Sequence, residues 1–303
     1  MIKIDIDERK WKKIKEEHSE WYSDNILPNI KNAYKFIESQ KSKSYSMKKY
    51  LELLKKIIDK GKDFIIQKEL FLDYENKEID KIIKIMKKKN KKRKSILEIC
   101  FEKLNISEEY LPNQLFCYKK LQTGNKDWNR HKLLSLIGIE ICPYCQRNYI
   151  SSYEENNDEK TTADLDHFYP KSLYPFLALS LYNFIPSCQI CNSRFKGNKD
   201  VCDSIYPYEE GFDELGVKFR TSKEVISEIL GERYSDFYIK IDYENLKNKE
   251  DGEKVKNSIE NLGLDRVYKK SHNQYIQNLL YTVEKYPENY LEACGEMFEN
   301  NKD

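Results

Sequence analysis

Apolar residues recur at helical spacing over most of the chain. Between residues 11 and 72 they lie three and four positions apart, and Pro28 is the obvious interruption. This spacing places apolar side chains along one face of an amphipathic helix, whereas a proline breaks the helical hydrogen-bond pattern. The same spacing appears in residues 79–86, 255–262 and 267–286. The pattern therefore predicts a mostly helical protein.

Two short segments alternate instead between apolar and polar residues. In residues 163–171 and 237–241 the side chains change character from one position to the next, as in a half-buried strand. Around the first segment, cysteines, prolines, tyrosines and turn residues replace the lysine-rich helical pattern. We therefore expect an α+β fold in three parts: a helical N-terminal region at 1–130, a small module at 131–208, and a C-terminal region at 209–303 with short strands and helices.

Charge is distributed unevenly among these three parts. The 303 residues carry a net charge of only +2, but residues 1–130 hold 32 Lys and Arg against 21 Asp and Glu, a net of +11. The net charge is −2 in residues 131–208 and −7 in residues 209–303. A basic region can bind nucleic acid, because neutralising phosphates releases their counterions. The basic run at 87–94 has two interpretations, a solvated helix end or loop and a direct phosphate contact.

Composition excludes several classes of protein. Charged residues make up 34% of the chain, but an aromatic share of 13% is too high for global disorder. No run of about 18 apolar residues is present, and the first residues lack the apolar stretch of a signal peptide. We therefore expect a soluble, cytoplasmic protein with no membrane partner, in which the eight cysteines are reduced.

Four of the cysteines form two pairs with the same spacing. Two residues separate Cys142 from Cys145, and two separate Cys188 from Cys191. Each Cys-x2-Cys pair, which we call a knuckle, can direct two thiolates at one ion. Four thiolates complete the closed tetrahedral site that Zn²⁺ prefers. Such a site has no position for water, so we expect a structural zinc. The alternative is two unrelated pairs in a reduced core. No ligand role is expected for the remaining cysteines, Cys100, Cys117, Cys202 and Cys294.

The segment between the knuckles contains an Asp-His pair. Alternation places Asp164, Asp166 and Phe168 on one face of the predicted strand, with Leu165 and His167 on the other. A carboxylate can hold a hard divalent cation beside a neutral imidazole that takes a proton from water. An Asp-His pair alone is a weak indication, because most such pairs are not catalytic.

The residue order around the second knuckle strengthens this interpretation. Asn183 precedes that knuckle and Asn192 follows it directly. The order Cys-x2-Cys, Asp-His-x-x-Pro, Asn, Cys-x2-Cys-Asn resembles the HNH nuclease motif in its His-Asn-Asn variant. The resemblance covers residues 141–208. This stretch is also similar to HNH proteins of bacterial antiphage systems, including the Septu-type nuclease subunit that works with an ABC-type ATPase.

The resemblance implies a ββα-metal fold with defined roles for four residues. His167 matches the general base that activates water. Asp166 and Asn192 match the ligands of one Mg²⁺ or Mn²⁺ ion on the scissile phosphate. Asn183 matches the asparagine that shapes the loop and helps to orient the base, although a plain turn residue is the alternative. The family often has His at the last position, and Asn192 there favours a harder ion.

Three further residues have more than one interpretation. Asp164 is a further metal ligand or a hydrogen-bond partner of one. Arg194 and Lys196 are candidate phosphate contacts, and the alternative for both is a solvated surface. We expect surface or capping roles for the remaining histidines, His18, His131 and His272, and core or interface packing for the three tryptophans.

Together these observations predict a metal-dependent HNH endonuclease that hydrolyses phosphodiester bonds, with DNA as the favoured substrate and antiphage defence as its setting. The partner that we consider is an ABC-type ATPase or another protein of a defence system. The N-terminal region would serve for targeting or for partner docking, and the acidic C-terminal region would serve as a cover or a second docking surface. Two alternatives stay open. One is a zinc-knuckle module that binds nucleic acid or protein without cutting it, and the other is an HNH nuclease acting on structured RNA such as tRNA.

Overall fold

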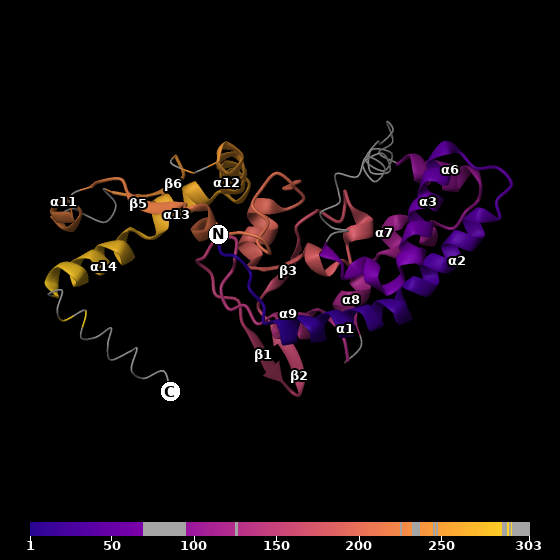
Figure 1. The fold of residues 1–303 in the computed structure, drawn as a ribbon, viewed down its shortest axis with the longest axis horizontal. Coiled ribbons are helices and arrows are strands. Elements are labelled where there is room, and N and C mark those ends of the chain that lie inside the picture. Colours follow the sequence, from indigo (N-terminus) through magenta and orange to yellow (C-terminus); the bar gives the residue numbers. More distant parts are fainter. Residues whose placement is uncertain are drawn as a thin grey trace. The chain divides into compact units, whose positions relative to one another are not determined.

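The chain folds as two compact units, residues 1–211 and residues 212–303 (Figure 1). The structure is a computed structural model, and it describes residues 1–68, 95–124, 127–224, 226–231, 237–244, 246, 248–286, 290 and 292. The basic run at 87–94, the predicted helix at 79–86 and Cys294 lie outside the described residues. The three-part division of the sequence stays a prediction, and both 1–130 and 131–208 belong to the first unit.

The first unit is mostly helical, as the apolar spacing predicts. Pro28 lies in the first turn of the second helix. Backbone N–H groups in a first turn have no acceptor within the helix, so the N–H that proline lacks is not needed there. Ser44 caps the third helix after a loop at residues 39–44 that the spacing did not predict. The helices are α1 (Glu8–Asn25), α2 (Leu27–Glu38), α3 (Tyr45–Lys60), α6 (Ile96–Lys103), α7 (Pro112–Leu115), α8 (Lys119–Thr123) and α9 (Arg130–Ile137). Short helical turns are η1 (Gly61–Ile65), η3 (Glu108–Tyr110), η4 (Pro175–Leu177), η5 (Leu181–Asn183) and the π-helical η6 (Ile190–Lys196).

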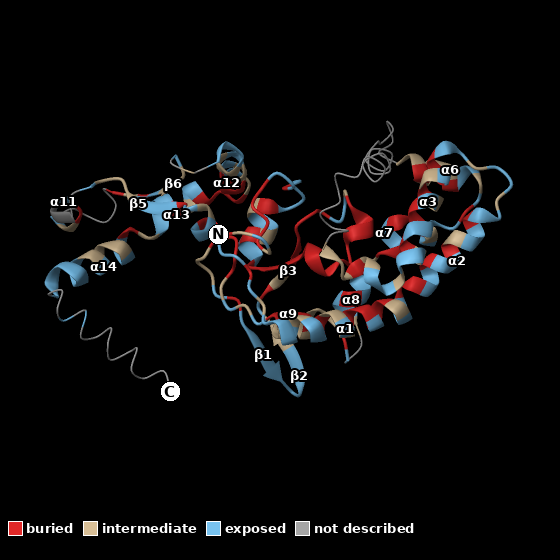
Figure 2. Cartoon of the chain, viewed as in Figure 1, coloured by how far each residue is buried: buried red, intermediate tan, exposed pale blue. Residues whose placement is uncertain are grey.

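The core of this unit forms where the apolar faces of the helices meet. Helix α2 packs against both α1 and α3, and α1 also contacts α9. On α1 the buried residues Ile14, His18 and Tyr22 follow one another at intervals of four and so share a face. Figure 2 shows this arrangement as buried stripes on helices whose other faces are exposed. Burial of these faces stabilises the helices more than their intrinsic propensity does.

Two antiparallel strand pairs complete the first unit. Strands β1 (Ser152–Glu155) and β2 (Asp158–Thr161) form a hairpin whose turn residues, Asn156 and Asn157, have φ of 55° and 63°. Positive φ at both positions is what a two-residue hairpin turn requires, and asparagine tolerates it. The sequence analysis did not predict this hairpin, because β1 is exposed along its whole length and lacks a buried face (Figure 2). Strand β3 (Asp164–His167) pairs with β4 (Phe184–Ser187), and His167 lies opposite Phe184.

The second unit combines one strand pair with helices. Strand β5 (Lys218–Thr221) pairs with β6 (Ile239–Asp242), which confirms a strand at the predicted alternating segment. Gly263 ends α12 with a φ of 58°, a left-handed conformation that favours glycine. The helices are α10 (Phe212–Leu215), α11 (Ile226–Gly231), α12 (Lys249–Leu262), α13 (Leu264–Ser271) and α14 (Asn273–Lys285). Among the described residues, no helix has both the length and the apolar character that a membrane crossing requires.

One prediction about the histidines is wrong. His18 has no exposed surface, although a surface or capping role was expected for it. The charged neighbours along the sequence were misleading, because Glu16 and Glu20 are exposed while His18 lies on the buried face of α1. His131 and His272 are half-buried. Trp128 is buried, in agreement with the expected packing role.

Candidate functional site

Two sites lie next to each other in the segment between residues 142 and 198. The first is the cysteine cluster. Cys142, Cys145, Cys188 and Cys191 are all buried, and their Sγ atoms lie within 4.8 Å of one another. In a tetrahedral zinc site with Zn–S bonds of about 2.3 Å, the sulfurs lie roughly 3.8 Å apart. The Sγ atoms of Cys145 and Cys188 are 4.0 Å apart, so the four thiols could hold a zinc ion.

Polar hydrogens around Cys188 favour its thiolate form. The amide Nδ2 of Asn148 donates to Cys188 Sγ at 3.1 Å, and the backbone N–H of Cys191 donates to it at 3.4 Å. Hydrogen bonds from neighbouring thiols, that of Cys142 foremost, hold the pKa of Cys188 well below its usual range. Metal binding requires deprotonated thiols, and hydrogen bonds to the ligands orient them. Asn148 therefore supports the cluster, a role that the sequence analysis missed.

The second site is built around His167, at the end of β3. Its Nε2 lies 2.9 Å from the carbonyl oxygen of Ala178, which can only accept, so the proton is on Nε2. The ring lines a pocket, and among the described residues none donates to its Nδ1. Burial lowers the pKa of His167 to about 3, and the charge of Lys171 contributes. The imidazole is therefore neutral near pH 7 and presents Nδ1 as a proton acceptor.

Asn183 fixes the loop that carries the acceptor of His167. Its side chain is fully buried, and its Oδ1 accepts from the backbone N–H of Tyr169 at 2.7 Å. Its Nδ2 donates to the carbonyls of Tyr169 at 3.1 Å and of Leu177 at 2.9 Å. Leu177 directly precedes Ala178, so the amide of Asn183 holds the loop beside the carbonyl that His167 binds.

Asp166 is part of a buried ion pair. Its Oδ1 lies 3.1 Å from Nζ of Lys196, and its Oδ2 accepts from the hydroxyl of Tyr144 at 2.7 Å. Lys196 also donates to the backbone carbonyl of His167 at 2.6 Å. Burial raises the pKa of Asp166, and the charge of Lys196 only partly opposes this effect. The amine of Lys196 is thus engaged inside the protein, although sequence analysis proposed it for phosphate contact.

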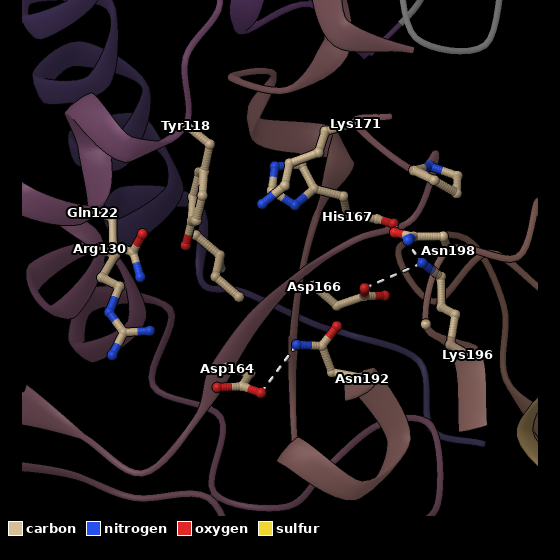
Figure 3. A pocket seen from close by; sticks show the side chains of 13 residues that line it. Tyr118, Gln122, Arg130, Asp164, Asp166, His167, Lys171, Asn192, Lys196 and Asn198 are labelled. Carbon is tan, nitrogen blue, oxygen red and sulfur yellow. Dashed lines mark hydrogen bonds and ion pairs between the residues drawn. The ribbon is translucent and has the colours of Figure 1, made fainter. Parts of the chain in front are cut away.

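Asn192 lies next to Asp164. Its Nδ2 donates to Asp164 Oδ2 at 2.9 Å, and Figure 3 shows its amide between the carboxylates of Asp164 and Asp166. Strand β3 places both aspartates at the pocket, and η6 brings Asn192 to them from the second knuckle. Among the described residues, only the four cysteines form a group of three or more His, Cys, Asp and Glu side chains close enough to share an ion. A cation at Asp164 and Asp166 would therefore also need amide oxygen, water or substrate as ligands.

The pocket has a volume of about 240 Å³, and part of its wall lies outside the segment that carries the motif. Tyr118, Gln122 and Arg130 come from the region of α8 and α9 (Figure 3). The ring of Tyr118 meets His167 edge-on, with centroids 4.7 Å apart, and Lys171 Nζ lies 4.7 Å from the Tyr118 centroid.

Two cations line this pocket without a carboxylate partner. No Asp or Glu among the described residues lies within ion-pair distance of Arg130 or Lys171. Arg130 hydrogen-bonds the side chain of Tyr118, whose pKa burial raises to about 12. Arg194, the other predicted phosphate contact, is exposed on η6 and is not part of the pocket wall. Sequence reasoning gave no role to these three residues: no spacing rule connects Tyr118 and Arg130 to the motif, and Lys171, although it directly follows the Asp-His-x-x-Pro motif, was passed over.

Comparison with known proteins gives two partial matches. The sequence matches no known family profile, and it matches no solved structure. Over 98 residues, 31% of this chain and 34% of the relative, it is 33% identical to the Septu protein PtuB of Bacillus thuringiensis. Over 73 residues, 23% of this chain and 21% of the relative, it is 33% identical to Protein ea31 of Escherichia phage lambda. The matched stretches span about a third and about a fifth of these relatives, and the first match suggests a Septu-related family.

Proposed function

We propose that this protein is a metal-dependent HNH endonuclease with a structural zinc in its four-cysteine cluster. The observation that carries the proposal is the state of His167. The ring is neutral, its Nε2 is anchored on Ala178, no described residue donates to its Nδ1, and His167 lines a pocket that also holds two aspartates and Asn192. These are the parts that phosphodiester hydrolysis needs: a base, hard ligands for a cation, and a cavity for the substrate.

The order of elements supports the same proposal. Strands β3 and β4 form an antiparallel pair, and η6 follows and brings Asn192 to the pocket. The HNH resemblance implies this order of strand, strand and helix. One cysteine knuckle precedes β3, and the other runs from the end of β4 into the start of η6, so a zinc there would tie the start of the segment to the start of η6. We infer that zinc holds the geometry and takes no part in the reaction, because four thiolates fill its coordination.

In the proposed mechanism His167 removes a proton from the attacking water. Its Nδ1 can accept, and its anchored Nε2–H keeps the ring in one orientation. The lowered pKa makes the imidazole a weak base in the free protein, but it also ensures that the ring is unprotonated at neutral pH. Asn183 acts indirectly through the loop and is a positioning residue.

Asp166 and Asn192 would hold the catalytic Mg²⁺ or Mn²⁺, with Asp164 as a further oxygen ligand. The donors fit a hard cation, because Mg²⁺ is usually bound by one or two carboxylates together with water and substrate oxygens. Lys196, Tyr144 and the backbone N–H of His167 occupy three of about four lone-pair positions on Asp166, so one stays available. Such an ion would stabilise the charge that develops on the phosphate and on the leaving oxygen.

Arg130 and Lys171 are the cations best placed to hold the phosphates of the substrate. Both line the pocket, and no Asp or Glu in the described part of the chain forms an ion pair with either of them, whereas Lys196 is engaged with Asp166. Arginine suits phosphate because its planar group can donate two parallel hydrogen bonds. DNA is the favoured substrate, and structured RNA is the alternative. Cleavage trials with both polymers separate these two substrates.

The biological setting that we propose is antiphage defence in the cytoplasm. Its support is the partial similarity to a Septu protein, together with the resemblance to HNH proteins of antiphage systems. A partner such as an ABC-type ATPase would then regulate cleavage. The rival function is a zinc-knuckle module that binds nucleic acid or protein without cutting it. That function accounts for the cysteines and for the basic region, but it gives no reason for a neutral histidine beside two pocket aspartates.

The decisive experiment is plasmid cleavage by purified wild type and His167→Ala, with Mg²⁺, Mn²⁺ or EDTA, and with zinc measured on the same samples. His272→Ala is the matched control, because it removes a histidine from the second unit. We expect cleavage that requires added metal, disappears in His167→Ala and persists in His272→Ala, with about one zinc per chain in all three. Full activity of His167→Ala would refute the mechanism. Zinc binding and nucleic-acid binding without cleavage of DNA or RNA, with and without partner proteins, would favour the binding module.

A further inference from the structure

Three consecutive carbonyl groups in one buried loop are each held by a different side chain. Asn183 Nδ2 donates to Leu177 O at 2.9 Å, and His167 Nε2 donates to Ala178 O at 2.9 Å. His18 Nε2 lies 2.8 Å from Leu179 O. The three loop residues are at most 4% exposed, so water cannot replace these donors. Two of the three donors belong to the proposed site, and the third comes from α1, about 160 residues earlier in the chain.

The side chain of His18 is fixed in one tautomer. Its Nδ1 accepts a hydrogen bond from Trp128 Nε1 at 3.0 Å, so its proton must be on Nε2, which points to Leu179. Burial lowers the pKa of His18 to about 4, and the ring is therefore neutral near pH 7. The rings of Trp21, at 5.6 Å, and Phe184, at 6.1 Å between centroids, enclose it.

The ring of Phe184 packs against both histidines and so links them by a second route, besides the loop carbonyls. Its ring is fully buried and meets His167 at 5.3 Å and His18 at 6.1 Å, near-perpendicular to both. A shift of His18 would therefore act on His167 along two routes, through the loop carbonyls and through the Phe184 ring. Close packing transmits such shifts because the interior has little free volume.

We propose that His18 is a positioning residue for His167. It holds Leu179 from the far side of the loop, so that the neighbouring carbonyl of Ala178 stays where His167 needs it. Helix α1 thereby sets the orientation of the base, which gives the N-terminal helical region a role in the reaction. The inference rests on the proposed nuclease function for its kinetic consequence, but its structural consequence, the tautomer and orientation of His167, can be measured without any activity.

Two variants separate donation by His18 from the volume that it fills. His18→Gln keeps an N–H donor at a reach close to that of Nε2, whereas His18→Leu fills similar space with no donor. Tyr50→Phe is the matched control, because it also removes one hydrogen bond to a carbonyl, from the buried Tyr50 to Tyr110 at 2.7 Å, and neither residue lines the pocket. Thermal melting and zinc content show whether each variant is folded.

The first readout is the nitrogen NMR spectrum of the His167 imidazole. We expect a single Nε2–H tautomer in wild type, His18→Gln and Tyr50→Phe, and a mixture of tautomers in folded His18→Leu. The second readout is cleavage. We expect kcat to fall about 10- to 100-fold in His18→Leu with KM nearly unchanged, and to recover in His18→Gln, because small misplacements of a catalytic group cost this much.

The outcomes separate the two proposals. A His167 spectrum and a kcat that are the same in His18→Leu and Tyr50→Phe would overturn the positioning role. A changed His167 tautomer in a protein that cuts no nucleic acid would support the positioning role and count against the nuclease. If His18→Leu does not fold, the His18→Gln spectrum still decides. Loss of the single tautomer despite a retained donor would also contradict the inference.

Discussion

Replacing Lys196 with Met would test whether a single lysine keeps Asp166 charged inside the protein. The two side chains are 1% and 3% exposed, and Nζ lies 3.1 Å from Oδ1. Methionine fills most of the space of lysine but has no charge. In Lys196→Met, Asp166 would keep the hydroxyl of Tyr144 and the backbone N–H of His167 but no positive charge, and the carbonyl of His167 would lose the Lys196 donor. Removing one member of a buried ion pair leaves an uncompensated charge and typically costs about 3–5 kcal/mol.

The loss of stability should depend on pH. Burial already raises the pKa of Asp166, and Lys196 is the largest opposing influence, so the variant raises this pKa further. A carboxyl with a higher pKa in the folded than in the unfolded state stabilises the fold below the unfolded pKa, and this stability is lost as the pH rises through the folded pKa. We therefore expect Lys196→Met to approach wild-type stability at acid pH and to lose about 1.4 kcal/mol for each unit by which the pKa is raised.

Urea unfolding at pH 5 and pH 8 is the assay. The matched control is the double variant with Asp166→Asn added, which has no buried charge and should regain most of the loss. If Asp166 also binds a divalent cation, Mg²⁺ should stabilise Lys196→Met more than wild type, because the ion replaces the missing positive charge. A loss of less than about 1 kcal/mol at pH 8, typical of an exposed pair, would refute the reasoning. An unchanged pH dependence would do so as well.

Three further predictions follow from the two sites. Cys188→Ser should lose zinc and lower the melting temperature, measured by metal analysis and thermal unfolding, whereas the exposed Cys202→Ser should keep both. Replacing Arg130 and Lys171 with Ala in an inactive His167→Ala protein should weaken DNA binding and reduce the slope of log K against log salt by about 2, and equal slopes would argue against phosphate contacts. Because the pKa of His167 is about 3, its protonation should not lower the cleavage rate between pH 5 and pH 7. A rate that falls in that range with the pKa of an ordinary histidine, about 6.5, would contradict a neutral buried base.

The sequence predicts those features that arise from local spacing. The two Cys-x2-Cys pairs lie 43 residues apart between Cys145 and Cys188, and yet their thiols meet, as two equal knuckles that share one metal would require. The alternation at residues 163–171 predicts β3, and the helical spacing predicts α1, α2 and α3. For these strands and helices, apolar residues recur with a period of two or about 3.6 residues, and this period is visible in the sequence itself.

What could not be predicted depends on contacts between distant segments. Tyr144 lies inside a knuckle, and only the fold turns its hydroxyl toward Asp166. Lys196 has the sequence context of a surface cation, but η6 directs its amine into the interior. Arg130 comes from α9 and lines the pocket together with residues of β3 and η6, an arrangement that no local pattern encodes. The candidate metal and base residues were therefore recognisable from the sequence, whereas their partners and the pocket wall were not.

The comparison between His18 and His167 shows why the surroundings of a histidine matter more than its sequence context. Both rings are buried, both donate from Nε2 to neighbouring carbonyls of one loop, and burial lowers both pKa values, to about 4 and about 3. They differ at the other nitrogen. Trp128 saturates Nδ1 of His18, whereas no described residue donates to Nδ1 of His167, whose ring lines the pocket. In our proposal the neutral imidazole of His18 therefore holds a loop by a hydrogen bond, whereas that of His167 can accept a proton. The first ring secures the loop on which the orientation of the second depends.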